Sequence, residues 1–328
     1  MTALIAAAKR EGTLTVIALP STFANYGTIM KTFTKLYGIK VTDIDPYVSS
    51  QQEVSQVKQH RGSQQAADVV DVETPVAQAN ASLFAPYQVA TWSAIPAGQK
   101  AQDGAWVQDY GGYMSVGYDP SKFGRITSLS QLLSHKFAGS IALDGNPSQA
   151  TSALYGVMMA NLALGGTASD ISAGVSFFRK LAAAGNLVSV PATTPLTIKS
   201  GTTPVVFNWD YLNTAPVVGR SASAWKVFIP PGAAVGSFYA QAINLHAPHP
   251  AAARLWEEFL YSQTADGGQN LWLKGGVRPV EMAAMTADHT IDAVAASAYP
   301  AIDGTATFLT TNEEAAATHY LRGHWKSG

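Results

Sequence analysis

The chain has 328 residues, with 21 Lys and Arg against 22 Asp and Glu, and it contains no cysteine. The length allows two lobes with separate hydrophobic cores, and the missing cysteines exclude thiol catalysis, zinc-thiolate sites and iron–sulfur clusters. A net charge of −1 without a long basic run argues against a nucleic-acid partner. Charged residues make up only 13% of the chain, which is more common in exported proteins than in cytosolic enzymes.

The N-terminal residues 1–10 lack the ordered charged, apolar and cleavage regions of a signal peptide. No stretch approaches the ~20 apolar residues of a transmembrane helix. Either the protein is cytosolic or a signal segment precedes Met1. A short helix at 3–10 that leads directly into the first strand favours a mature start that has been replaced by Met1.

Three β-α units follow, with a continuous apolar strand expected at 14–19 and further strands at 39–44 and 68–72. Short links between such units predict a parallel sheet, and parallel strands place the loops at their carboxyl ends along one edge. The loop after the first strand carries Ser21, Asn25 and Tyr26, and Glu73 with Thr74 follows the third strand. We therefore expect these side chains to lie at a common ligand-binding edge.

A second β-α series starts near residue 112 and is inserted within the first. It includes expected strands at 113–118, 141–143 and 204–207 and a buried helix at about 149–164. A strand at 237–245 is long enough, at ~3.3 Å per residue, to return from one lobe to the other, and a helical tail follows it. We predict two α/β lobes, lobe 1 comprising 1–111 and 242–328 and lobe 2 comprising 112–241.

The strand at 204–207 runs directly into Asn208, Trp209 and Asp210. Strand carboxyl ends in open α/β sheets are ligand-binding positions, and an indole beside a carboxylate suits a cationic group. The alternative is structural, because a Trp at a strand end often only packs and an Asp there often only caps a helix.

Two further places have both a structural and a functional interpretation. Asn146 either caps a helix, or belongs with the helix start at Gln149 to a ring of N–H groups that faces an anion. Tyr239 and Gln241 alternate on the returning strand and share a face. Both therefore either pack near the core or point into a cleft.

Several enzyme signatures are absent, including a phosphate-binding loop, a dinucleotide fingerprint and a nucleophile elbow, and we expect no cofactor. His246 and His249 have metal-ligand spacing, but their Pro-rich turn without a nearby third ligand favours solvated loop histidines, and we expect no metal. Glu73 and Asp210 could act as the acid and base of a hydrolase or lyase. Their expected positions on different lobes weigh against that alternative.

Eight segments, in this order and over nearly the whole chain, resemble the extracellular solute-binding proteins of bacterial ABC importers, family 1. They are 11–16 (EGTLTV), 37–41 (YGIKV), 67–72 (ADVVDV), 83–87 (LFAPY), 113–119 (YMSVGYD), 139–147 (GSIALDGNP), 185–188 (GNLV) and 204–212 (PVVFNWDYL). The chain is most similar to the branch that takes up polyamines, ferric ion or 2-aminoethylphosphonate.

The resemblance implies an α/β periplasmic-binding-protein fold, type II-like, with the second lobe inserted in the first and the ligand cleft between the lobes. It implies a non-enzymatic monomer that captures a small solute by closure of the lobes and delivers it to the membrane subunits of an ABC permease. It also implies a periplasmic or lipid-anchored extracellular location.

Residue by residue, the polyamine branch has aromatic and polar groups after the first strand, which match Ser21, Asn25 and Tyr26. It has a polar position after the third strand, matched by Glu73 or Thr74.

That branch also uses a Trp with a nearby Asp from the second lobe, matched by Trp209 and Asp210. A further Trp and Asp on the returning strand are replaced here by Tyr239 and Gln241. The resemblance therefore implies a solute with one amine group, polyamine-like or an aminophosphonate, whose other end contacts Asn146 and the start of the helix at Gln149. Another small polar solute, such as an amino acid or a carboxylate, is the alternative. Ferric ion is disfavoured because the adjacent tyrosines of the iron branch are missing.

Overall fold

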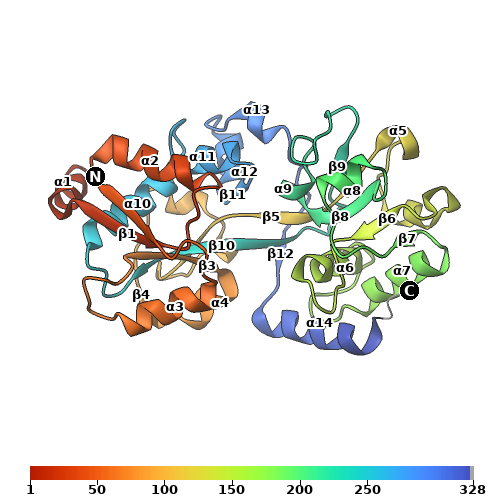
Figure 1. Ribbon diagram of the computed structural model, residues 1–328, viewed down its shortest axis with the longest axis horizontal. Coiled ribbons are helices and arrows are strands. Elements are labelled where there is room, and N and C mark those ends of the chain that lie inside the picture. The colour runs from red at the N-terminus through yellow and green to blue at the C-terminus, as the bar shows by residue number, and fades with distance from the viewer. Residues whose placement is uncertain (326–328) are drawn as a thin grey trace. The chain divides into compact units, whose positions relative to one another are not determined.

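Alternating strands and helices build both units of the protein, which the computed structural model describes for residues 1–325 (Figure 1). The first unit comprises Met1–Gly111 and Phe238–Ala296, and the second comprises Gly112–Ser237 and the chain from Ser297 onward. The fold is the mixed α/β, two-lobe periplasmic-binding-protein fold that the sequence predicts. Two strands, β5 (Val107–Tyr118) and β10 (Val235–Asn244), contribute residues to both units.

The C-terminal segment differs from the expected domain assignment. It was expected in the first lobe, but the chain from Ser297 onward belongs to the second unit. There β12 (Thr307–Phe308) pairs in parallel with the start of β10, and α14 (Thr311–His324) follows it (Figure 1). Leu321 of α14 is fully buried in the core of this unit. Burial of this apolar face accounts for the position of the segment.

The first unit begins with the three expected β-α units. Its elements before β5 are α1 (Thr2–Glu11), β1 (Thr13–Ile17), α2 (Tyr26–Tyr37), β2 (Lys40–Ile44), α3 (Ser50–Gln59), β3 (Val69–Glu73), α4 (Thr74–Ala79), η1 (Ala81–Leu83), β4 (Phe84–Ala85), η2 (Trp92–Ala94) and η3 (Ala97–Gln99). Those after β10 are α10 (Pro250–Leu260), α11 (Gly268–Lys274), β11 (Arg278–Pro279), α12 (Met282–Ala287) and α13 (Ala293–Ala296). Glycines end the first two helices: Gly12 after α1 and Gly38 after α2 both adopt the left-handed conformation that is common at helix C-termini.

The sheet pairing of this unit is only partly the expected one. β1 and β2 pair in parallel, as predicted. β3 is instead antiparallel to β10, with Tyr239 opposite Glu73 and Gln241 opposite Asp71. The returning strand is thus a partner of β3, and this pairing brings the side chains of β3 and β10 into one layer.

The second unit has a core of aliphatic and aromatic side chains around β8. Its remaining elements are α5 (Pro120–Phe123), η4 (Leu129–Leu133), η5 (His135–Phe137), β6 (Ile141–Leu143), α6 (Thr151–Ala163), α7 (Ser172–Ala183), β7 (Leu187–Val188), α8 (Pro195–Lys199), β8 (Val205–Trp209), α9 (Asp210–Asn213) and β9 (Lys226–Phe228). β6 lies between β7 and β8 in parallel, and β5 is antiparallel to β8 and β9. α6 is apolar almost all round and buried, as expected of a central helix.

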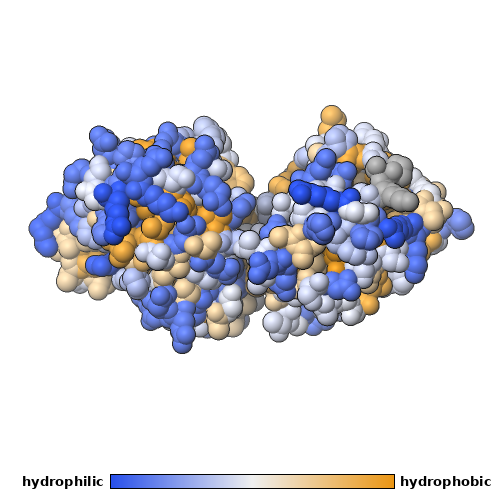
Figure 2. Space-filling model, turned by 90° about the horizontal axis from the view of Figure 1, so that it is seen from below, coloured by the Kyte–Doolittle hydropathy of each residue, from blue (hydrophilic) through white to orange (hydrophobic). Residues whose placement is uncertain are grey.

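The face in Figure 2 mixes hydrophilic and hydrophobic residues on both units. Within the described residues, no helix combines the length and apolar character that crossing a bilayer requires.

Candidate functional site

The first unit contains a cavity of about 380 Å³ beside the carboxyl ends of β1, β2 and β3. The segments that follow β1 and β2 reach it, and so does the carboxyl end of β3. Its lining residues are Ala18, Pro20, Phe23, Pro46, Tyr47, Val48, Ser49, Ser50, Gln51, Glu53, Asp71, Glu73, Tyr110 and Tyr239. The edge at which the sequence predicted ligand binding therefore contains a cavity.

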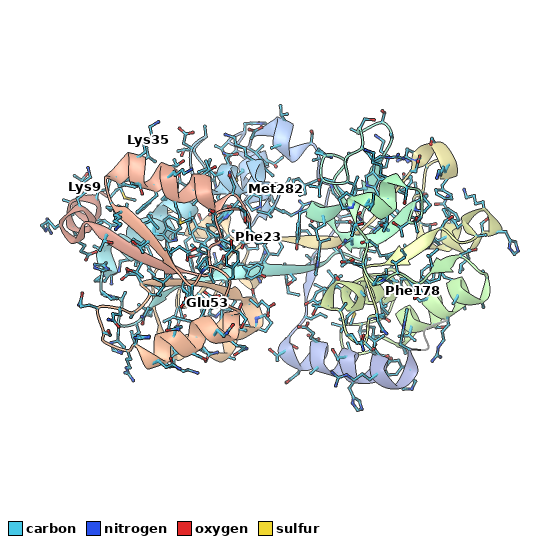
Figure 3. All side chains as sticks on the ribbon, in the orientation of Figure 1. Lys9, Phe23, Lys35, Glu53, Phe178 and Met282 are labelled. Atoms are coloured by element: carbon cyan, nitrogen blue, oxygen red, sulfur yellow. The ribbon has the colours of Figure 1, made fainter. Side chains whose placement is uncertain are left out.

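The polar lining of this cavity is acidic. Glu53 from α3 and Asp71 from β3 are 1% and 4% exposed, and Glu73 at the end of β3 is exposed. None of the described lining residues is a lysine, arginine or histidine. Figure 3 labels Glu53 together with Phe23, which comes from the loop before α2. An acidic cavity of this kind favours a cationic occupant.

Asp71 takes part in more hydrogen bonds than the other acids that line the cavity. Its Oδ2 accepts hydrogen bonds from Tyr26 OH at 2.6 Å and from Tyr110 OH at 3.1 Å. Its backbone N–H donates to Glu53 Oε2 at 3.1 Å. The second carboxyl oxygen, Oδ1, is buried and accepts no N–H or O–H group of the described residues. A buried acceptor without a donor is costly, so a ligand with an N–H group would stabilise it.

Asp109, on β5, lies behind Asp71 in the same polar cluster. The charge of Asp71 contributes, after burial, to the raised pKa of Asp109. Asp109 Oδ2 also accepts a hydrogen bond of 3.1 Å from Gln241 Nε2, which donates at 3.2 Å to Tyr26 OH as well. Asp109 is fully buried. This cluster connects α2, β3, β5 and β10 beneath the cavity.

Burial dominates the ionisation of these acids. Desolvation raises the pKa of Asp71 to about 7, although the hydrogen bonds from Tyr26 and Tyr110 oppose the shift. Burial and the charge of Asp71 raise the pKa of Glu53 to about 10, and the same two causes hold the pKa of Asp109 well above its usual range. All three shifts have the sign expected of carboxyl groups that lack a cationic partner.

Aromatic rings form the rest of the wall. Tyr110 and Tyr239 stack with their ring centroids 5.5 Å apart and their planes at 20°. Phe23 meets Tyr110 edge-on at 6.2 Å, and Tyr47 is 82% exposed beside the cavity. Aromatic faces beside carboxylates are the combination that recognises ammonium groups.

The loops at the cavity have unusual backbone conformations. Ala18, which follows β1, has φ +60°, and Asp45, which follows β2, has φ +51°. Ala24 and Asn25 in the same first loop have φ +47° and +63°. Alanine in this left-handed region costs about 1 kcal/mol or more, and such strain is concentrated at functional sites. The surrounding structure therefore holds these loops in one defined shape.

The predicted residues of the first unit fall into two groups. Glu73 and Tyr239 line the cavity, whereas Ser21 is exposed outside its lining. The others are tied to the interior: Asn25 Nδ2 donates to the Leu271 carbonyl at 2.8 Å and Thr74 Oγ1 donates to the Phe238 carbonyl at 2.7 Å. Tyr26 and Gln241 are fully buried and support Asp71 and Asp109 from behind.

The Trp209 and Asp210 pair of the second unit is buried within that unit. Trp209 is 8% exposed and packs on Tyr155, with ring centroids 5.0 Å apart, and on Tyr211. Asp210 is fully buried, and its Oδ1 accepts the backbone N–H of Tyr113 at 3.1 Å. These contacts give both residues a structural role beside any functional one.

Asn146 does not cap the helix, as one of its two interpretations predicted, because the N-cap of α6 is Ala150 and carries no side-chain cap; Asn146 closes the turn before the helix instead. Its Oδ1 accepts the backbone N–H and the hydroxyl of Ser148, at 3.0 and 2.9 Å. α6 begins at Thr151, so Gln149 lies before the helix and not in it. Gln149 does line a cavity of about 510 Å³ in the second unit, where Arg322 is the one charged residue of the described lining.

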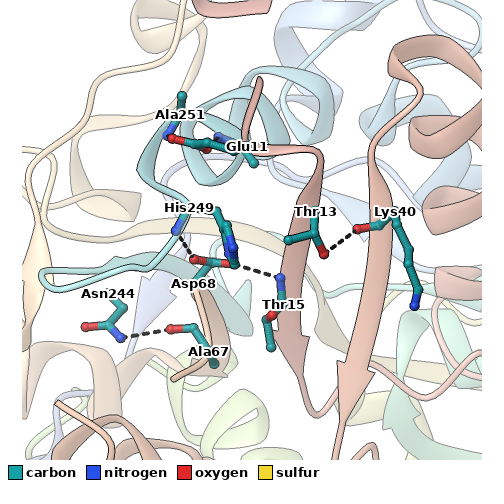
Figure 4. A network of polar contacts seen from close by, with 10 residues as sticks. Glu11, Thr13, Thr15, Lys40, Ala67, Asp68, Asn244, His249 and Ala251 are labelled. Atoms are coloured by element: carbon teal, nitrogen blue, oxygen red, sulfur yellow. Dashed lines mark hydrogen bonds and ion pairs between the residues drawn. The ribbon is translucent and has the colours of Figure 1, made fainter. Parts of the chain in front are cut away.

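His249 belongs to a polar network around Asp68 (Figure 4). His249 Nδ1 lies 2.9 Å from Asp68 Oδ2, and the His249 backbone N–H donates to Asp68 Oδ1 at 2.7 Å. The same Asp68 accepts the N–H of Thr15, while Glu11 accepts the first N–H groups of α10. His249 is thus half-buried in a network that joins β1, β3 and α10, unlike the exposed His246. Among the described residues there is no group of three or more His, Cys, Asp or Glu placed to hold a metal ion.

The sequence interpretation missed Glu53, Asp71, Asp109, Tyr110 and Phe23. One signal was available for Asp71, because it interrupts the apolar run of β3 between Val70 and Val72. An acid inside a buried strand needs a partner or a function. Glu53 gave a weaker signal, since it lies four residues before the buried Val57 and therefore on the same helix face.

Solved structures with a similar fold are solute-binding proteins. A Bordetella parapertussis protein assigned as an extracellular solute-binding protein matches with a TM-score of 0.76 and 14% identity, covering 96% of this chain and 98% of that chain. The Bordetella ferric binding protein matches with a TM-score of 0.65 and 19% identity, covering 95% and 96%. PotD, a spermidine/putrescine ABC transporter substrate-binding protein from Streptococcus pneumoniae, matches with a TM-score of 0.65 and 12% identity, covering 96% and 99%.

At these identities the structural matches show the fold alone. A search of curated protein sequences found no match. The family assignment comes from the sequence itself, because residues 68–298 match the model of the family described as bacterial extracellular solute-binding protein. Such proteins bind small solutes for ABC importers and deliver them to a permease, and they are transport proteins and not enzymes. With more than half of its length matched, the chain belongs to the bacterial extracellular solute-binding protein family.

Proposed function

We propose that this solute-binding protein takes a small solute that carries an amine group, either polyamine-like or an aminophosphonate, and that the cavity of the first unit receives the ammonium end. The observation that carries the proposal is Asp71, a residue of the acidic cavity lining whose buried Oδ1 accepts no N–H or O–H group of the described residues. An ammonium group supplies both the N–H donor and the positive charge that this oxygen lacks.

The other lining residues support the same chemistry. Glu73, which is exposed, is suited to attract a cation from solution, and Tyr239 offers a ring face beside it. Ferric ion fits less well. Burial holds the phenol pKa of Tyr26 and of Tyr110 well above the usual value, which disfavours the phenolate ligands that ferric ion would require.

The proposal can be tested by thermal shift and titration calorimetry with putrescine, spermidine and 2-aminoethylphosphonate. Ethylphosphonate and succinate serve as ligands without an amine. Saturation at ~100 times the dissociation constant adds ~2.7 kcal/mol of stability, so a bound amine gives a clear shift. Stabilisation by ethylphosphonate or succinate, without stabilisation by any amine, would favour the alternative of a carboxylate or another polar solute.

Variants locate the site. Asp71→Asn removes the charge beneath the cavity, and we expect at least a tenfold loss of amine affinity, because a charge-assisted hydrogen bond contributes ~1.5–3 kcal/mol. Glu73→Gln removes an exposed charge and is expected to weaken binding by ~1 kcal/mol or less. Asp288→Asn is the matched control, since Asp288 is an exposed acid of the same unit outside the cavity lining. Equal affinities for Asp71→Asn and Asp288→Asn would refute the assignment.

We further propose that the protein works as a monomer in the periplasm or at the cell surface through a lipid anchor. The extracellular solute-binding family and the low fraction of charged residues support this location. Sedimentation analysis and fractionation of the native producing cell test the two statements separately.

A further inference from the structure

Six basic side chains of the second unit lie close together, outside the linings of the two cavities described above. They come from two stretches of the sequence, 119–136 and 199–226, in which the acids are Asp119 and the fully buried Asp210. We call the surface that they form the basic face: Lys122, Arg125, Lys136, Lys199, Arg220 and Lys226.

The end of β5 brings two of these side chains together. Lys226 of β9 lies opposite Tyr118, the last residue of β5. Asp119 follows directly, and its Oδ2 lies 2.6 Å from Arg220 Nη2 in an ion pair. β9 and the loop before it are therefore held at the same strand end as α5, which begins at Pro120.

Contacts of α5 add further cations. A Cβ atom built on Gly201 would lie 3.0 Å from Lys122 Nζ, so Lys122 reaches the turn that follows α8 and its last residue, Lys199. Lys136 Nζ donates a 3.0 Å hydrogen bond to the carbonyl of Phe123, the last residue of α5. Figure 1 shows α5, α8 and β9 on the same side of the second unit.

Only a small part of this positive charge is neutralised within the protein. Arg220 pairs with Asp119, but within residues 1–325 the other five cations form no ion pair. All five, including Arg125 just after α5, are exposed. Like charges held close together repel one another, so an anionic surface that neutralises them from outside is favourable.

Exposed aliphatic side chains lie beside these cations. Leu196 is 76% exposed and lies three residues before Lys199 on α8, which places both on one side of this helix. Val217 is 40% exposed, and the adjacent Val218 packs in one small core cluster with Ile198 of the same helix. The basic face thus combines positive charge with protruding aliphatic groups.

This combination indicates the kind of partner. A bilayer surface offers phosphate groups to the cations and, just beneath them, hydrocarbon to the aliphatic side chains. An acidic protein surface would match the cations alone and leave Leu196 in water. Lysine provides four of the six cations, and its point charge meets a phosphate group without a fixed geometry.

We propose that the basic face binds the surface of an anionic phospholipid membrane, with lipid phosphate groups at the cations and Leu196 in the interface. The proposal concerns the second unit and does not rest on the proposed solute. The family to which the chain belongs delivers solutes to a membrane permease, so a membrane surface is where the protein works. Adhesion through the basic face would keep the protein at that surface between deliveries.

Vesicle co-sedimentation tests the proposal with the full chain and without any solute. The vesicles consist of phosphatidylcholine, either alone or with about 30% phosphatidylglycerol. We expect binding to the anionic vesicles, at least tenfold weaker binding to pure phosphatidylcholine, and loss of binding at about 0.5 M salt, where charges are screened within about 4 Å. Equal binding to both kinds of vesicle, or binding to neither, would overturn the proposal. Binding to polyglutamate but not to the anionic vesicles would also overturn it and assign the basic face to an acidic protein.

Charge variants locate the contact. The triple variant Lys122→Gln, Lys199→Gln and Lys226→Gln should bind anionic vesicles at least tenfold more weakly, because each cation near an anionic membrane strengthens binding about fivefold. The control is a triple variant of exposed lysines of the first unit with the same change in net charge, two of which Figure 3 labels: Lys9→Gln, Lys31→Gln and Lys35→Gln. This control should stay within about twofold of wild type. An equal loss in the two triple variants would show attraction by net charge alone and overturn the assignment to the basic face.

A fluorescent label tests the contact of Leu196 with lipid and does not depend on the lysine variants. The chain has no cysteine, so Leu196→Cys provides a single position for an environment-sensitive dye. Its emission should shift to the blue when anionic vesicles are added. Leu36→Cys is the control, since Leu36 is 51% exposed and follows Lys35 in the first unit. No shift at position 196, or the same shift at both positions, would overturn the proposal.

Discussion

The hydroxyl group of Tyr26 donates a 2.6 Å hydrogen bond to Asp71 Oδ2. Tyr26 is fully buried and Asp71 is 4% exposed, so bulk water cannot take the place of either partner. The bond favours the ionised form of Asp71 and opposes the effect of burial. Tyr26 was expected at the ligand; in the structure it is fully buried and bonded to Asp71, a residue of the cavity lining.

Replacing Tyr26 by Phe should therefore lower the stability of the protein. Loss of the hydroxyl leaves Asp71 with Tyr110 as its remaining phenol donor, and we expect the free energy of unfolding at about pH 8 to fall by ~1–2 kcal/mol. Tyr37→Phe is the control, because the Tyr37 hydroxyl makes no hydrogen bond to the described residues. Urea unfolding of the two variants measures the difference, and equal stabilities would contradict the role of the Tyr26 bond.

Glu53→Gln should change how stability depends on pH. The folded pKa of Glu53, about 10, lies above its ordinary value of 4.5, so the folded state keeps a proton that the unfolded chain loses. This contribution to stability is complete below about pH 4.5 and is lost as the pH rises through about 10. Wild type should lose up to ~1.4 kcal/mol per pH unit more than Glu53→Gln over this range. Parallel curves of unfolding free energy against pH would refute the shift.

Asp68→Asn should destabilise the first unit. Asp68 is fully buried and accepts hydrogen bonds from the N–H groups of Thr15 and His249 besides its contact with the His249 ring. Asparagine can satisfy only part of this set, and we expect a loss of ~2 kcal/mol or more. His246→Gln, at the exposed histidine of the same turn, should stay within ~0.5 kcal/mol of wild type. Urea unfolding measures both, and a small effect of Asp68→Asn would show that the network is not needed.

Gly112→Ala should disturb the second unit at Asp210. A Cβ atom at Gly112 would lie 2.5 Å from Asp210 Oδ1 and 2.5 Å from Tyr211 Cδ1, closer than packed atoms approach. Overpacking of this kind costs ~1–3 kcal/mol and should lower the melting temperature by several degrees. Gly98→Ala, which meets no atom within 4 Å, is the control. Equal melting temperatures for the two variants would contradict the close approach.

Local patterns predicted the elements of the fold. The apolar run at 141–143 is β6 without adjustment, and the runs at 14–19 and 39–44 lie within one or two residues of β1 and β2. β1 and β6 are short and carry buried apolar residues, which a local pattern can detect. The pairing of β3 with β10 was not predicted, because it joins residues more than a hundred positions apart and no local pattern records it.

The candidate site was predicted less completely for the same reason. Glu73 and Tyr239 were found because each follows a local rule, a strand end or a strand face. Asp71 acquires its properties from its burial and from Tyr26 and Tyr110, which the fold brings to it from two other elements. The ionisation state of a buried acid depends on such partners, so composition and spacing could not reveal it.

The division of the chain between the units also determines when each can fold. The first unit needs Phe238–Ala296 to complete its sheet and the helices that cover it. The second needs the chain from Ser297 onward because Leu321 of α14 fills part of its core. A growing chain therefore cannot finish its N-terminal unit before most of the polypeptide has been synthesised. The usual order, in which an N-terminal domain folds first, does not apply here, and the unfinished chain remains available to an export machinery or a chaperone until its last segments emerge.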